Sequence, residues 1–157
     1  MQTPSGTTAT TTTATNVTAQ LLPSKVIPPV TGGESGGSGT VTITLHVTKD
    51  ASGKTTTATA DFHATVNGFP VDSLFTAAHV HRGDAACSAP CPVVIDTTAI
   101  TAPGVLFATR SGSIDKLGVT VNPATLADEL LSNPSAFYFD VHTASNQNGV
   151  ARGQLAK

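Results

Sequence analysis

A period of two between apolar and polar side chains dominates this sequence and limits the chain to a fold built from β-strands. Residues 41–47 (VTITLHV) and 59–66 (TADFHATV) alternate strictly, so each segment has one apolar and one polar face. Asn67-Gly68 follows the second segment and is typical of a tight turn. The same reasoning predicts further strands, at residues 77–81, 92–96, 105–109, 137–142 and 150–155.

A single short helix is predicted over residues 123–132. Asn122 suits the N-cap, Pro123 suits the first helical position, and Pro134 prevents the helix from continuing. About seven short strands, separated by turns rich in glycine and proline and accompanied by one helix, are typical of an all-β antiparallel sandwich.

The first 19 residues differ from the rest of the chain, because they are rich in threonine and hold almost no large apolar side chain. Such a tract cannot bury enough surface to fold alone. We therefore expect residues 1–19 to be a tail or arm, and residues 20–157 to be one β-sandwich domain. The tail is either a flexible spacer or, because threonine favours β-structure, an arm that adds a strand to a neighbouring sheet.

Composition excludes two classes of partner and favours one compartment. Charged residues make up 11% of the 157 residues and the formal net charge is -2, so the chain lacks a basic surface for nucleic acid. The sequence contains no apolar run of about 18 residues that could span a membrane. No signal peptide is recognisable after Met1. Low charge and two close cysteines favour a secreted protein, either extracellular or periplasmic.

Histidines of two predicted strands share a face. His79 and His81 flank Val80, so the two imidazoles lie about 6.6–7 Å apart on the side away from the core. In residues 137–142 the same alternation places Asp140 and His142 on the outer face. If these strands are neighbours, about 4.8 Å apart, three imidazoles can converge on one metal ion. Three nitrogen ligands with an open position suit copper or zinc.

A plainer interpretation is that the histidines are polar members of amphipathic strands. We accept this interpretation for His46 and His63, which alternate with apolar residues in the first two segments.

The two cysteines also allow two interpretations. Cys87 and Cys91 can form a disulfide across a short loop, which we favour, or can join His79 and His81 in a zinc site.

Several motifs together are similar to one known family. The segments TVNGF, TAAHVHRG and FYFDVHTASNQNGVARGQL resemble, in the same order, motifs of the CHRD (chordin-type) domain, over residues 21–155. The resemblance implies an antiparallel Greek-key, immunoglobulin-like β-sandwich, distantly similar to copper/zinc superoxide dismutases. On that similarity His79, His81 and His142 correspond to copper ligands.

The departures from the dismutases matter as much as the similarity. No histidine lies between Cys87 and Pro123, so the bridging ligand and the zinc-binding loop have no counterpart, and zinc is the less expected metal. Gly149 stands where the dismutases carry a substrate-guiding arginine, and Arg152 stands where they carry a disulfide cysteine. Fast superoxide dismutation is therefore not expected, and Arg152 is expected to pair with Asp140.

Three functional hypotheses follow, and the sequence favours binding over catalysis. The first is a secreted CHRD-type domain that binds copper at its surface through His79, His81 and His142. The second is an extracellular structural subunit that self-associates when one copy donates its Thr-rich N-terminal strand to the next. The third is a weak redox enzyme of the superoxide dismutase type.

Overall fold

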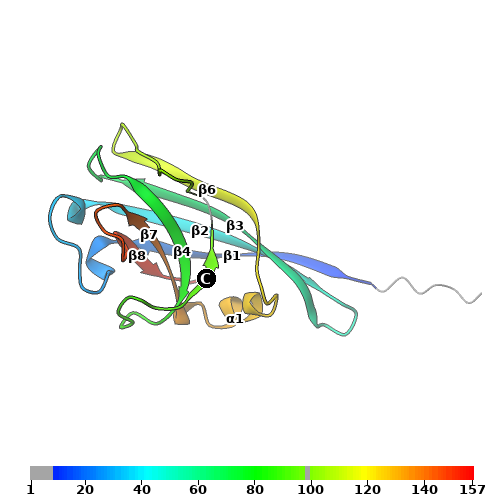
Figure 1. The fold of residues 1–157 in the computed structure, drawn as a ribbon. Coiled ribbons are helices and arrows are strands. Elements are labelled where there is room, and N and C mark those ends of the chain that lie inside the picture. The colour runs from blue at the N-terminus through cyan, green and yellow to red at the C-terminus, as the bar shows by residue number, and fades with distance from the viewer. Residues whose placement is uncertain (1–8, 98–99) are drawn as a thin grey trace, which may run out of the picture.

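The computed structural model describes residues 9–97 and 100–157, which form two antiparallel sheets packed face to face (Figure 1). In spatial order, the first sheet contains β1 (Thr11–Leu21), β2 (Ser38–Lys49), β3 (Thr55–Asn67) and β6 (Ser111–Thr120). The second contains β5 (Val93–Asp96), β4 (Phe75–Arg82), β7 (Phe137–Thr143) and β8 (Ala151–Gln154). The predicted all-β antiparallel sandwich is confirmed.

Connections that cross between the sheets give the fold its Greek-key order. β3 pairs with β6 rather than with β4, and β4 pairs with β7 as well as with β5. As a result β4 and β7, which are far apart in the chain, lie side by side. This pairing brings the two histidine-bearing segments together.

Four short helices accompany the sheets in the described residues: η1 (Pro23–Lys25), η2 (Gly33–Gly36), α1 (Leu126–Ser132) and η3 (Pro134–Ala136). The predicted helix exists but begins three residues late, because residues 123–125 form a turn in which the Leu126 N–H bonds to the Pro123 carbonyl. Thr125, not Asn122, occupies the N-cap. In residues 9–97 and 100–157 no helix has the length and apolar character needed to cross a membrane.

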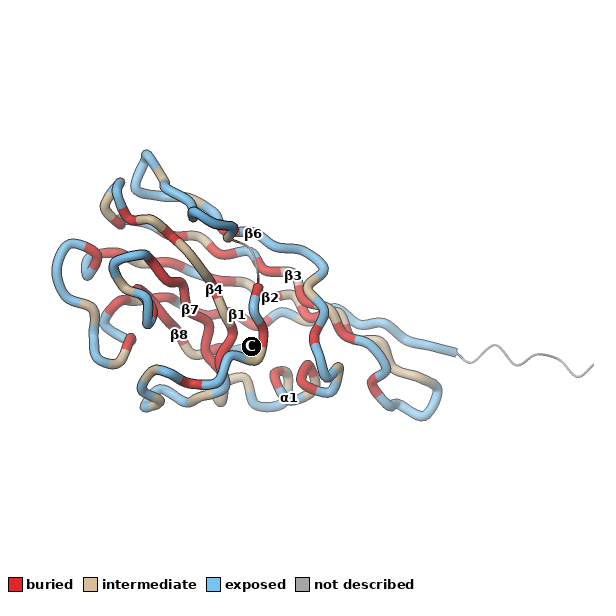
Figure 2. Tube along the Cα trace, in the orientation of Figure 1, coloured by how far each residue is buried: buried red, intermediate tan, exposed pale blue. Residues whose placement is uncertain are grey.

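The core fills the space between the sheets, and it is built from the apolar faces that alternation predicted (Figure 2). Every second residue of β2 from Gly39 to Val47 is buried, and the residues between them are half-buried or exposed. Phe62 of β3 stacks on Phe139 of β7 across the interface, with ring centroids 6.0 Å apart. Burial of these apolar faces is the main stabilising contribution to the fold.

Two strands were not predicted, and one prediction is wrong. Residues 105–109 form no strand, and only Val105 makes an isolated bridge, to Phe75. The sixth strand is instead Ser111–Thr120, in which Ile114 is the one buried residue, so it lacks the alternating apolar signal. The other unpredicted strand, β1, includes residues 11–19 of the Thr-rich tract, paired along their length with β2. The expected domain boundary at residue 20 therefore falls inside a strand.

Candidate metal centre

The centre is assembled by the register of two adjacent strands. His79 of β4 lies opposite Asp140 of β7, and His81 lies opposite Tyr138. Val80 and Val141 are completely buried in the core between the sheets, so their neighbours in sequence project from the other face of the sheet. Two motifs of the same spacing, HVH in β4 and DVH in β7, thus direct four polar side chains to one place.

The four side chains converge closely enough to hold a metal ion. His142 Nε2 lies 3.0 Å from His79 Nδ1 and 3.0 Å from Asp140 Oδ1, and His81 Nε2 lies 3.1 Å from the same oxygen. One ligand atom from each of these residues lies within 4.8 Å of all the others. For comparison, ligands at about 2.0–2.1 Å from a tetrahedral metal are about 3.3 Å apart.

Backbone carbonyls orient two of the imidazoles. His81 Nδ1 lies 2.9 Å from the carbonyl oxygen of Cys91, and His142 Nδ1 lies 2.9 Å from that of Gln147. A carbonyl oxygen only accepts, so each Nδ1–H donates and each Nε2 faces Asp140. A carbonyl that fixes the tautomer in this way is the usual outer partner of a metal-binding histidine.

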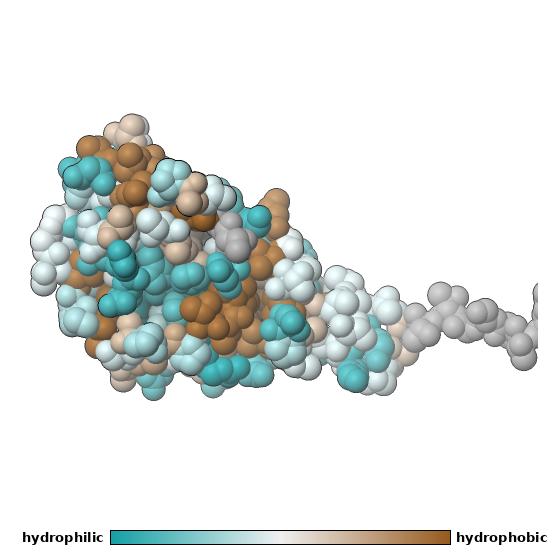
Figure 3. All heavy atoms as spheres, viewed as in Figure 1, coloured by the Kyte–Doolittle hydropathy of each residue, from teal (hydrophilic) through white to brown (hydrophobic). Residues whose placement is uncertain are grey.

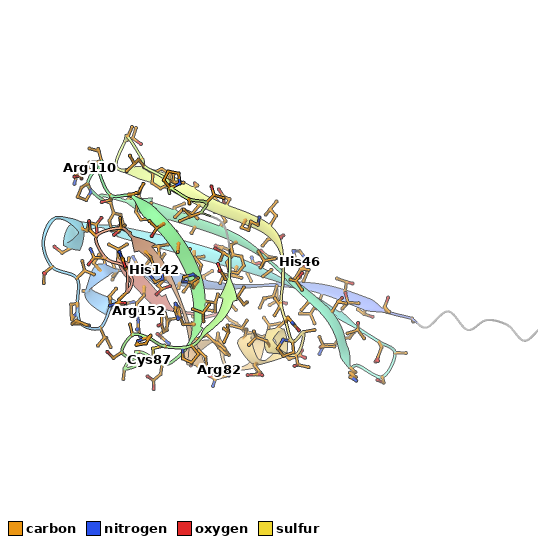
Figure 4. The ribbon with its side chains drawn as sticks, in the orientation of Figure 1. His46, Arg82, Cys87, Arg110, His142 and Arg152 are labelled. Carbon is orange, nitrogen blue, oxygen red and sulfur yellow. A yellow bond between two sulfur atoms is a disulfide. The ribbon has the colours of Figure 1, made fainter. Side chains whose placement is uncertain are left out.

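The loop that carries Cys91 is held by a disulfide and by Arg152. The predicted disulfide between Cys87 and Cys91 is present. The guanidinium of Arg152 donates to the carbonyl oxygens of Cys87, Asp84 and Ala85, at 2.7, 3.0 and 3.4 Å. Figure 4 shows Arg152 between His142 and Cys87.

Arg152 also reaches the centre through an aromatic stack. Its guanidinium lies 3.9 Å from the ring centroid of Tyr138, and the Tyr138 ring stacks on His81 at 4.7 Å with an interplanar angle of 9°. A cation over an aromatic face is an attractive contact. The stack therefore limits how far the His81 ring can rotate.

Burial and charge move the pKa values of Asp140, His142 and His79 in different directions. Burial alone raises the pKa of Asp140, but hydrogen bonds and charges from His142 and His81 hold that pKa below its usual value. Burial alone lowers the pKa of His142, but Asp140 outweighs it and raises that pKa. Burial and the neighbouring His142 lower the pKa of His79. Asp140 is thus the anionic group about which the three rings gather.

The centre has one open side, at His79. The side chain of His79 is 19% exposed, against 8% for His81, 10% for His142 and 3% for Asp140. A depression of about 240 Å³ lined by His79 and Asp96 lies at this side. On the face seen in Figure 3, hydrophilic residues gather where Figure 4 places His142. A small ion can therefore reach the cluster past His79.

Two expectations about these residues need correction. The cluster is not a surface patch, because every residue of β7 is buried and the loop held by Arg152 covers the outer face of the sheet. Asp140 and Arg152 do lie opposite each other in β7 and β8, but in the described residues they form no ion pair. Asp140 contacts His81 and His142, and Arg152 bonds to loop carbonyls.

The remaining histidines lie outside the cluster, as predicted. His46 Nε2 is 2.8 Å from Asp61 Oδ2, and His63 pairs with Asp115 on the sheet that does not carry the cluster. Figure 4 shows His46 well away from His142.

Asp140 was predicted from the sequence only as a residue that supports the ligands, not as a ligand itself. The signal for a ligand position was present, since DVH repeats the spacing of HVH.

Comparison with known proteins assigns the chain to one family. A family model for the CHRD domain matches residues 17–155, which includes all four residues of the cluster. No curated protein and no solved structure matches the chain.

Proposed function

Because the chain belongs to the CHRD domain family, we propose that it is a binding domain that works outside the cytosol and holds copper through His79, His81, His142 and Asp140. The observation that carries the proposal is the convergence of three imidazoles and one carboxylate, whose ligand atoms all lie within 4.8 Å of one another. When His81 and His142 are neutral and donate Nδ1–H to their carbonyls, each turns an unprotonated Nε2 to Asp140 Oδ1, and a cation between these acceptors relieves their repulsion. In the metal-free protein a proton can take that role, and in the bound protein a metal ion does.

The chemistry of the donors favours copper over zinc. Imidazole suits both metals, but at a given nitrogen and oxygen site divalent copper binds more tightly than divalent zinc. Both rings that donate Nδ1–H to carbonyls already present Nε2 to the ion, so binding needs no change of tautomer. The disulfide supports an oxidising compartment outside the cytosol.

Copper titration of metal-free protein tests the proposal. We expect one copper ion per chain, and a loss of affinity in His79→Ala, His81→Ala and His142→Ala at least as large as the roughly 10–100-fold that outer partners of a metal site cost. His46→Ala is the matched control, because His46 bonds to Asp61 instead. Unchanged copper affinity in all three variants would eliminate the proposal, and tighter binding of zinc than of copper would reassign the metal.

Self-association is a second candidate function, and the open edge of β1 favours it. Thr18 of β1 and Leu22, which directly follows β1, already bond along this edge to Ala156 and Arg152. The preceding part, Thr11 to Asn16, pairs only with β2 in the described structure. Unpaired backbone groups on an exposed edge can add a strand from another copy.

A proline on this edge tests self-association. Ala14 is an even number of residues from Thr18, so its N–H points to the same open edge and not to β2. Ala14→Pro therefore removes one outward donor while it preserves the pairing of β1 with β2. We expect sedimentation to show assemblies in the wild type and in the control Ala14→Val, but not in Ala14→Pro. A wild type that stays monomeric rules this function out.

A further inference from the structure

A second polar depression, of about 350 Å³, lies where three segments meet at the left of Figure 1. These segments are the loop that contains η2, the turn between β3 and β4, and the loop between β7 and β8. The lining side chains that carry oxygen are Thr31, Glu34, Asp72, Ser73, Ser145 and Asn146. Among the described residues no lysine, arginine or histidine lines the depression, so its charge is negative.

Glu34 is a buried carboxylate without a cation. It is 8% exposed, and its Oε2 accepts hydrogen bonds from Thr143 Oγ1 at 2.8 Å and from Asn146 Nδ2 at 2.6 Å. Both donors are neutral, and the ion pairs of the described residues do not include Glu34. A buried carboxylate is costly unless an opposite charge lies beside it. Its position at this depression therefore favours a bound cation.

Ser73 gives a second and independent indication. It lines the same depression, is 4% exposed, and its Oγ has no hydrogen-bond partner in the described structure. A buried hydroxyl is normally paired, so an unpaired one leaves a place for a partner from outside the chain, a water or an ion. The adjacent Asp72 is exposed and brings a second carboxylate to the same edge.

We propose that this depression is a calcium site to which Glu34, Asp72 and Ser73 contribute ligands. All the side-chain groups with lone pairs are oxygens, which hard cations prefer, and the depression has no imidazole or thiolate for a transition metal. Calcium takes six to eight oxygens in a flexible geometry, so it suits ligands from three loops. Magnesium demands a regular octahedron and keeps its water, and it fits such a site less well.

Calcium at this position has a structural consequence for the copper centre. Glu34 already bonds to Thr143 and Asn146 at the start of the loop between β7 and β8. The same loop supplies the Gln147 carbonyl that orients His142. A bound ion therefore ties the loop containing η2 to the loop that orients a copper ligand, although calcium binding itself does not depend on copper.

Calorimetric titration of the metal-free protein with calcium tests the site. We expect one saturable site with a dissociation constant of about 10⁻⁴–10⁻³ M, the range of extracellular calcium modules. Asp72→Asn should weaken binding by roughly tenfold or more, because charge count sets calcium affinity, and Ser73→Ala should weaken it by a smaller factor. Magnesium at equal concentration should not displace the ion.

Asp50→Asn is the matched control, since it removes one exposed carboxylate from the turn at the far end of β2 and β3. It should bind calcium as the wild type does. Three outcomes overturn the proposal: no saturable binding up to roughly 10 mM, above the range of such modules, unchanged affinity in Asp72→Asn, or an equal loss of affinity in Asp50→Asn. None of these outcomes bears on copper binding, which is measured separately.

Discussion

Gly149 lies beside Asp140 of the candidate metal centre and leaves little room for a side chain there. Its φ is +112°, in the region that L side chains rarely adopt, and a Cβ placed there would lie 3.3 Å from Asp140 Oδ2. Gly149→Ala should lower the free energy of unfolding by about 1–3 kcal/mol because of backbone strain. It should also lower copper affinity, because the new methyl group displaces Asp140. Denaturant unfolding and copper titration measure the two effects.

Gly53→Ala is the control that separates the loss of stability from the loss of copper affinity. Gly53 also has a positive φ, +82°, but a Cβ there would meet nothing within 4 Å. We expect it to lose stability and to keep the copper affinity of the wild type. If Gly149→Ala binds copper as tightly as Gly53→Ala does, Gly149 is not needed for the position of Asp140.

Alternation was enough to place the side chains of the centre on one face, but not to predict their burial. The H-x-H spacing directs His79 and His81 away from the core whatever the rest of the chain does. Their exposure depends on segments far along the chain, since Arg152 holds the covering loop of residues 84–87. Long-range packing of that kind leaves no periodic signal, and a segment such as FYFDVHT reads as half-exposed although both its faces are covered.

The loop between β4 and β5 allows stability and the proposed metal binding to be tested in one variant. The disulfide closes a loop of five residues, and the chain-entropy model gives such a loop about 2 kcal/mol. Cys87→Ser combined with Cys91→Ser should lower the free energy of unfolding by about that amount. It should also weaken copper binding, because the Cys91 carbonyl that orients His81 becomes mobile. Denaturant unfolding and copper titration of the double variant check both effects, and unchanged copper affinity would contradict the second.

Helix α1 is attached to the first sheet by an acidic residue, which makes its docking sensitive to pH. Hydrogen bonds from Thr55 and Lys49 lower the pKa of Asp128. Because the folded pKa lies below the unfolded value of about 3.9, the stabilisation is fully present above that value and is lost as the pH falls through the lower folded pKa.

Asp128→Asn should therefore destabilise the protein at neutral pH and have little effect in strong acid, where both forms are uncharged. Thermal unfolding across this pH range is the measurement. An equal loss of stability at both extremes would show that the charge of Asp128 does not stabilise the fold.

The elements that were predicted are those with strict alternation, and the ones that were missed lie at edges of the first sheet. β2 and β3 bury one whole face, so their pattern is clear. β1 and β6 are its outer strands, and β6 buries little beyond Ile114. Partners across the sheet, rather than composition, decide whether such segments become strands.

The two sheets share one core. A substitution that leaves a cavity in this core should lower the free energy of unfolding without changing the candidate metal centre. Phe62 is 1% exposed and stacks on Phe139 from the opposite sheet. Phe62→Ala should cost about 3–5 kcal/mol of unfolding free energy. The copper spectrum of the folded variant should match that of the wild type, because the ligands project from the other side of β4 and β7. An altered spectrum would mean that the centre depends on core packing.

All four side chains of the candidate centre lie on paired strands, and this affects how a metal ion would bind and dissociate. Hydrogen bonds between β4 and β7 fix the spacing of the donors in the empty protein, so the ion does not have to organise the chain around itself. On the proposed function, an ion would bind to and leave the folded protein without the chain rearranging, which suits reversible exchange better than permanent retention.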